Sequence, residues 1–112
     1  MSFLRACFEV QPSAAEFETI LAFNMMVPRH ARLGLLGRQG VYDEQLRALD
    51  IPVLVTQGAR DQLVMPSMAQ HTAAMARQSR LSMYENIGHS PFWEDSARFN
   101  RELSEFVKAA QR

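Results

Sequence analysis

Two short apolar runs, each followed by a turn that contains glycine, dominate the pattern of hydrophobic and polar positions along this chain. The first reads I-P-V-L-V-T from Ile51, and the second reads L-S-M-Y-E from Leu81. A short run of β-branched and other apolar residues bounded by turn residues is typical of a β-strand. The segment between them, residues 66–78, has the length and composition of a helix. The pattern therefore predicts a βαβ unit with parallel strands near residues 51–57 and 81–85.

Apolar side chains recur at helical spacing in two further segments. Ser13 with Glu16 three residues later forms a capping box, which predicts a helix that begins there. The last segment of the chain is the clearest amphipathic helix, with Asp95 or Ser96 as its cap. Its apolar residues are Phe99, Leu103, Phe106, Val107 and Ala110. We expect this stripe to face inward.

The first half of the chain gives weaker signals. Residues 3–10 are apolar and short, so they fit either a strand or the end of a helix. Residues 29–38 predict a short or interrupted helix, because Gly34 and Gly37 each weaken a helix by about 1 kcal/mol relative to alanine. Residues 43–49 predict another short helix.

Each of the two predicted strands is followed by one ionisable residue, Asp61 after the first and His89 after the second. In open α/β sheets, reactive groups lie on the turns beyond the carboxyl ends of the strands. We therefore expect the two side chains to converge, within hydrogen-bond reach or one rotamer change of it. A carboxylate bonded to an imidazole forms the acid and base part of a nucleophile–histidine–acid triad.

The sequences around these two residues resemble a known family. G-A-R-D-Q-L-V around Asp61, followed by I-G-H-S-P-F-W-E around His89, resembles the C-terminal end of an α/β-hydrolase. The resemblance implies an α/β fold class: a partial α/β-hydrolase fold with a C-terminal βαβα unit, two parallel strands and preceding lid-like helices. It also implies a division into a helical lid or cap remnant, residues 1–48, and the C-terminal part of the hydrolase core, residues 49–112.

The resemblance implies catalytic roles for both residues, in a hydrolase of ester-type small-molecule substrates that uses a serine nucleophile. His89 would act as general base and then as general acid, and Asp61 would orient its ring. Asp61 also fits a turn residue that bonds its own backbone, and the two interpretations are compatible. Asp43, Asp50 and Asp95 fit helix caps or turns better, so Asp61 is the preferred acid.

The nucleophile of that family is missing from the sequence. It occupies a G-x-S-x-G elbow upstream of the acid, and this motif is absent from the chain. The nearest serines, Ser67, Ser90 and Ser96, lack flanking glycines, and so does Cys7. We therefore expect a chain that is inactive alone, as a truncated product, a fragment or one half of a split enzyme. The sequence leaves open whether the chain by itself is an enzyme.

An alternative belongs to a different functional class. A two-stranded sheet with apolar faces leaves an unpaired edge, which is a template for another chain. The chain would then be a non-catalytic interaction module, or a split-enzyme half, that binds an N-terminal half or a second copy of itself through this edge.

The composition excludes several other classes. Twelve basic and 12 acidic side chains give no net charge and no basic stripe, so nucleic acid is not an expected partner. No stretch reaches the roughly 20 apolar residues of a membrane span, and a membrane is not expected either. A single cysteine fits a cytoplasmic protein. His30, His71 and His89 are scattered without matched carboxylates, so we expect neither a metal site nor a cofactor.

Overall fold

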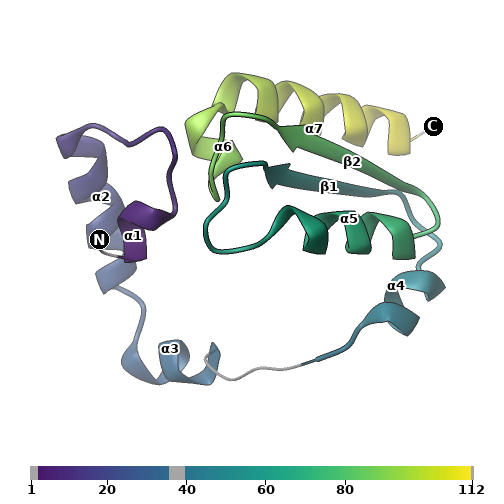
Figure 1. The fold of residues 1–112 in the computed structure, drawn as a ribbon, viewed down its shortest axis with the longest axis horizontal. Coiled ribbons are helices and arrows are strands. Elements are labelled where there is room, and N and C mark those ends of the chain that lie inside the picture. Colours follow the sequence, from purple (N-terminus) through teal and green to yellow (C-terminus); the bar gives the residue numbers. More distant parts are fainter. Residues whose placement is uncertain (1–2, 36–39, 112) are drawn as a thin grey trace. The chain divides into compact units, whose positions relative to one another are not determined.

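The computed structural model describes residues 3–35 and 40–111. Its elements in chain order are α1 (Phe3–Ala6), α2 (Ala14–Met25), α3 (Arg29–Leu35), α4 (Asp43–Ala48), β1 (Val53–Gly58), α5 (Pro66–Met75), β2 (Ser79–Tyr84), α6 (Pro91–Glu94) and α7 (Ser96–Ala110) (Figure 1). Contacts within the chain divide it into two units. One unit comprises the described residues of Met1–Gln11 and Asp43–Arg112, and the other is Pro12–Tyr42.

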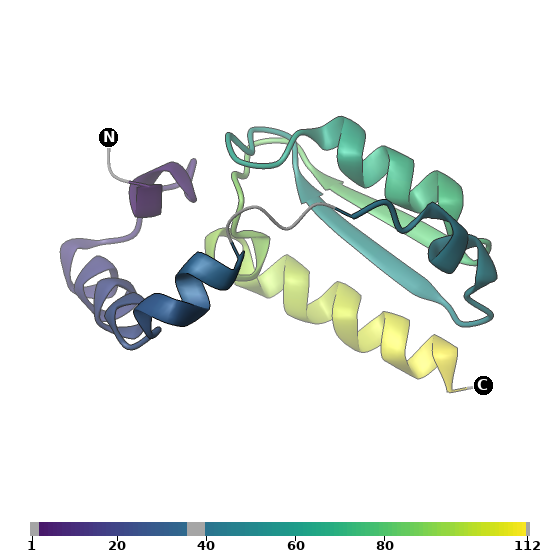
Figure 2. The ribbon, with the colours of Figure 1, turned by 90° about the horizontal axis from the view of Figure 1, so that it is seen from below.

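The first unit contains a parallel two-stranded sheet between two helices. β1 pairs with β2 from Val53 opposite Ser79 to Gly58 opposite Tyr84, which confirms the predicted parallel pair. α5 covers one face of the sheet and α7 covers the other (Figures 1 and 2). Because the strands are parallel, the turns that follow them both begin at the same end of the sheet, where the carboxyl ends of the strands lie.

The face of β2 against α7 is held by polar groups as well as by apolar packing. Ser82 and Tyr84 are buried, and their hydroxyl groups donate to a carboxylate oxygen of Glu102 at 2.6 and 2.9 Å. The guanidinium group of Arg98 lies 3.7 Å from the centre of the Tyr84 ring and donates to Glu102 at 2.9 Å. Burial alone would raise the pKa of Glu102, but these donors lower it to about 2. Burial and the bond to Glu102 raise the pKa of Tyr84 to about 12.

The apolar stripe of α7 is only partly covered. Phe99 and Phe106 are half-buried, while Leu103 and Val107 remain 41% and 44% exposed. The expectation of an inward stripe is therefore met in part. Two strands are too narrow a surface to cover a helix of four turns.

The second unit contains α2 and α3. The predicted capping box is confirmed, because the Ser13 hydroxyl accepts the Glu16 amide N–H while the Glu16 carboxylate accepts the Ser13 amide at 2.8 Å. These bonds from Ser13 lower the pKa of Glu16. The short helix predicted at residues 29–38 is α3 as far as Leu35, and its end at residues 36–38 lies outside the described residues.

The remaining segments join the first unit. Of the two possibilities for residues 3–10, the structure has a helical turn, α1, followed by an irregular stretch. α4 corresponds to the short helix predicted at residues 43–49. The division at residue 48 into a lid or cap remnant and a hydrolase core stays a prediction. Within the described residues, no helix combines the length and apolarity that crossing a membrane would require.

Candidate functional site

The turns after β1 and β2 lie in direct contact. Gly58, the last residue of β1, has no room for a side chain, because a Cβ there would collide with the carbonyl oxygen of Gly88. The amide of Arg60 donates to the carbonyl of Ile87 at 3.0 Å, which ties the first turn to the second. Glycine at these positions allows the two turns to approach closely enough for their side chains to meet.

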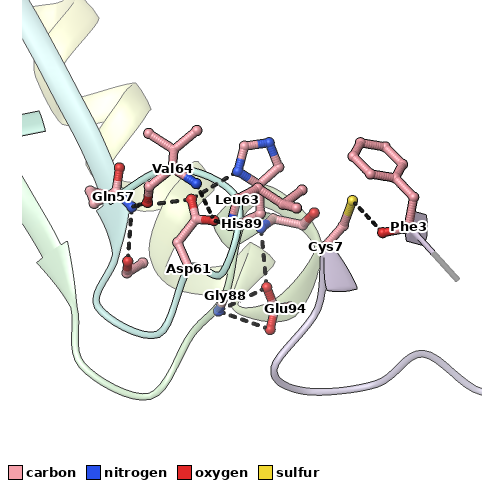
Figure 3. A network of polar contacts seen from close by, with 11 residues as sticks. Phe3, Cys7, Gln57, Asp61, Leu63, Val64, Gly88, His89 and Glu94 are labelled. Carbon is pink, nitrogen blue, oxygen red and sulfur yellow. Dashed lines mark hydrogen bonds and ion pairs between the residues drawn. The ribbon is translucent and has the colours of Figure 1, made fainter. Parts of the chain in front are cut away.

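The Asp61 carboxylate lies at the centre of this contact (Figure 3). Its Oδ1 accepts the amides of Leu63 at 2.8 Å and Val64 at 3.0 Å, which is the predicted turn geometry. Its Oδ2 accepts the side-chain amide of Gln57 at 3.1 Å and lies 2.8 Å from Nδ1 of His89. The Asp61 side chain is 4% exposed, so nearly all of its hydrogen-bonding capacity is used inside the protein.

The pKa of Asp61 is lowered by this environment. Burial alone would raise it, but the Val64 amide, the His89 ring and the Leu63 amide together outweigh burial. Hydrogen bonds from N–H donors favour the charged form of a carboxylate. Asp61 is therefore a carboxylate at neutral pH and can accept a hydrogen bond from the ring N–H of His89.

His89 presents one ring nitrogen to Asp61 and the other to solvent. Its side chain is 40% exposed, and Nε2 has no hydrogen-bond partner among residues 3–35 and 40–111. The predicted convergence of the two side chains is confirmed by the 2.8 Å distance. Because the Asp61 carboxylate only accepts, Nδ1 is assigned the proton, which leaves a lone pair on Nε2. That lone pair can accept a proton from a group placed beside it.

Gln57 was not singled out by the sequence patterns. Its side chain is buried, and Nε2 lies 2.9 Å from the carbonyl of Gly58, 3.0 Å from that of Val64 and 3.1 Å from Asp61. It thus joins the end of β1 to the Asp61 turn. The available signal was a polar amide at the end of the apolar run I-P-V-L-V-T-Q.

Glu94 is the second group that the sequence patterns missed. Its Oε1 accepts the amides of Glu9 at 2.8 Å, Val10 at 2.7 Å and Gly88 at 3.1 Å. Its Oε2 accepts the amides of Gly88 and Ser90, both at 3.1 Å. The carboxylate therefore holds the backbone on both sides of His89. The sequence patterns also missed the short helix α6, which has only four residues.

In the part of the chain that the structure describes, none of the candidate nucleophiles Ser67, Ser90, Ser96 and Cys7 has its side chain hydrogen-bonded to the ring of His89. Ser90 is buried with its backbone amide on Glu94, and Ser67 and Ser96 are exposed. The Cys7 thiol donates to the carbonyl of Phe3 at 3.5 Å. Burial, with the negative charges of Asp61 and Glu94, raises the pKa of Cys7, which disfavours the reactive thiolate.

The other ionisable residues near the site form exposed pairs. His71 is exposed as predicted, and its Nε2 lies 2.8 Å from Asp43, so α5 and α4 are linked. Arg60 is exposed and lies 2.8 Å from Glu9. Among the described residues, no three His, Cys, Asp or Glu side chains are grouped in a way that could hold a metal ion.

The chain is similar to several known hydrolases, although no family model matches it. A proline iminopeptidase from Lactobacillus delbrueckii subsp. lactis is 30% identical over 66 residues, which are 59% of this chain and 22% of that protein. A protein described as an aryl esterase from Burkholderia cenocepacia has a solved structure with a TM-score of 0.87. It is 34% identical and matches 97% of this chain and 40% of that chain. The solved structure of the esterase RhEst1 from Rhodococcus sp. ECU1013 has a TM-score of 0.80 and is 32% identical in sequence. The match covers 88% of this chain and 36% of the esterase.

This chain spans about 40% of the length of the solved structure from Burkholderia cenocepacia and 22% of the length of the proline iminopeptidase. The fold and these similarities agree on one conclusion, which is that the chain belongs to the α/β-hydrolase fold family.

Proposed function

We propose that this chain is the C-terminal, acid-and-base part of an α/β-hydrolase that cleaves ester-type substrates with a serine nucleophile. The observation that carries the proposal is the 2.8 Å contact between Asp61 Oδ2 and His89 Nδ1, with Nε2 of the ring open to solvent. This is the arrangement by which a carboxylate orients an imidazole toward a nucleophile.

In the proposed reaction, His89 moves protons and Asp61 holds the ring. Nε2 removes the proton from the attacking serine hydroxyl, and the imidazolium that forms is stabilised by the Asp61 carboxylate. The ring then gives this proton to the leaving alcohol. A water molecule completes the cycle in the same way, with His89 again as base and then as acid. The serine and the donors that bind the oxyanion come from a part of the hydrolase that this sequence does not include.

A chimera tests this proposal. This chain would replace the equivalent part of the Burkholderia cenocepacia protein, whose structure matches 97% of it at 34% identity. Hydrolysis of phenyl acetate would first be confirmed for the unmodified host. We expect the chimera to retain hydrolysis, and His89→Ala to lower kcat by roughly 10³-fold or more. Asp61→Asn should lower kcat by roughly 10²-fold or more, because the ring then loses its acceptor.

The matched control for His89 is His71→Ala in the same chimera. His71 also lies 2.8 Å from an aspartate, but this pair is exposed and links α4 to α5. The His71→Ala chimera should have a kcat within about twofold of that of the parent chimera, since exposed ion pairs contribute little to stability. A His89→Ala chimera as active as the parent chimera would contradict the proposal, and so would a folded chimera without activity.

A second function is favoured by the exposed apolar surface of the first unit. Ile51, Met65, Met68 and Phe92 are each more than half exposed. Such a surface fits a module that binds another chain, either the rest of a hydrolase or a second copy. Sedimentation velocity over a hundredfold concentration range distinguishes a self-associating chain from one that stays monomeric until an N-terminal half is added.

A further inference from the structure

The loop that carries His89 has all three of its consecutive amide groups bound. The N–H groups of Gly88 and Ser90 donate to Glu94, and the N–H of His89 itself donates to the carbonyl of Cys7 at 3.1 Å. A loop between a strand and a helix does not need such contacts for the connection alone. Here the amides on both sides of His89 donate to the Glu94 carboxylate, and the amide of His89 donates to the neighbouring segment at Cys7.

The same carboxylate also binds a segment from the other end of the chain. Oε1 of Glu94 accepts the amides of Glu9 and Val10, 85 and 84 residues away. The segment of residues 7–10 is thus bound to the His89 loop twice, through Glu94 and through the Cys7 carbonyl. Its Glu9 side chain also pairs with Arg60, one residue before Asp61.

There is little free space between these groups. A Cβ on Gly88 would lie 2.6 Å from the amide nitrogen of Glu9 and 3.2 Å from Oε2 of Glu94. Phe8, in the middle of the segment, is buried. Displacement of the segment would therefore displace the backbone of the His89 loop, and the reverse also holds.

We propose that Glu94 is a positioning residue for His89: its carboxylate, bound to the amides on both sides of His89 and to residues 9 and 10, keeps the ring where Nδ1 meets Asp61. The inference rests on the proposed function for its catalytic meaning, but the positioning itself is a property of this chain. Glu94 does not touch the ring, so it acts through the backbone. Hydrogen bonds from several N–H groups to one carboxylate are charge-assisted and are stronger than those to a neutral acceptor.

The test compares Glu94→Gln and Glu94→Asp with Glu105→Gln in the full 112-residue chain. Glutamine has the same shape but replaces one acceptor oxygen by an NH₂ group, which repels the amides that pointed at it. Glu105 is an exposed glutamate on α7, so its variant controls for the loss of one charge. Hydrogen exchange would be measured at residues 9, 10, 88 and 90, and the ¹⁵N shifts of the His89 ring would report its tautomer.

We expect Glu94→Gln to speed exchange at these four amides by about tenfold or more. The fraction of His89 with its proton on Nδ1 should fall at the same time. Amides in the middle of β1 and β2 should keep their exchange rates, which a general loss of stability would not allow. Glu94→Asp, which keeps the charge on a shorter side chain, should give a smaller change, and Glu105→Gln should give none.

Unchanged exchange and an unchanged His89 tautomer in Glu94→Gln would overturn the inference. If Glu94→Gln does not fold, Glu94→Asp serves as the test variant. A wild-type His89 tautomer together with wild-type exchange rates in Glu94→Asp would then overturn the inference. In the chimera, Glu94→Gln should lower kcat at an unchanged KM. An inactive parent chimera would contradict the proposed function, while the tautomer in the 112-residue chain would still decide the role of Glu94.

Discussion

Replacement of Glu102 by glutamine should remove much of the acid sensitivity of this chain. Glu102 accepts hydrogen bonds from Ser82, Tyr84 and Arg98 between β2 and α7, and its pKa is lowered from 4.5 to about 2. A carboxyl group with a lowered pKa stabilises the folded state above its ordinary pKa. This contribution is lost as the pH falls through the pKa of the folded state.

The size of the effect follows from the two pKa values. Their difference corresponds to at most roughly 3–4 kcal/mol in the free energy of unfolding, at about 1.4 kcal/mol for each pH unit. The Arg98 side chain is a third exposed, so solvent and salt weaken its attraction for Glu102. We therefore expect roughly 1–2 kcal/mol, fully present above pH 4.5 and lost progressively toward pH 2.

Urea unfolding at pH 6, 4 and 3, followed by the fluorescence of Trp93, measures this contribution. Glu102→Gln should be less stable than the wild type at pH 6, and the two proteins should approach each other as the pH nears 2. Glu105→Gln, an exposed change on the same helix, should follow the wild type at each pH. Wild type and Glu102→Gln with parallel pH profiles would refute the assignment of the low pKa to these hydrogen bonds.

Four further predictions concern activity, acid–base behaviour and association. The purified chain should hydrolyse p-nitrophenyl acetate no faster than its His89→Ala variant, and a saturable, clearly faster rate would reveal an unrecognised nucleophile. In the chimera, Gln57→Ala should lower kcat about tenfold because Asp61 loses a buried donor, whereas an unchanged kcat would make Gln57 purely structural. Absorbance titration should show Tyr84 ionising near pH 12 in the folded chain and near 10 in urea, so its stabilising contribution is complete below pH 10 and is lost progressively as the pH rises from 10 through about 12. The apolar surface should produce concentration-dependent association in sedimentation velocity, and a monomer at all concentrations would contradict that expectation.

The fold could be predicted from the sequence where local patterns agree with tertiary contacts. The apolar run at residues 51–57 was recognisable as a strand because β-branched residues and a following glycine both favour it. The convergence of Asp61 and His89 followed from topology, since parallel strands bring their carboxyl ends to one edge. The boundaries of β2 were less accurate, at Ser79–Tyr84 rather than residues 81–85, because its buried face is polar.

The supporting groups of the site could not be predicted in this way. Glu94 binds backbone amides that are 84 and 85 residues away, and a backbone amide has no residue type by which a sequence pattern could identify it. The same holds for Gln57, two of whose three partners are carbonyl groups. α6 escaped detection because four residues are too few for helical periodicity to appear. The two ionisable side chains of the candidate site could be identified from the sequence, whereas the groups that hold them depend on three-dimensional contacts.

The hydrogen bonds of Asp61 have a consequence for the order in which a hydrolase of this kind becomes competent. All of the donors to its carboxylate, from Gln57 to His89, lie within 33 consecutive residues and belong to a single strand–helix–strand unit. No part of the chain outside this unit contributes a donor to the carboxylate among the described residues. In the hydrolase that we propose, a nucleophile would therefore meet an acid–base pair that this chain has already assembled, and activity would depend on docking.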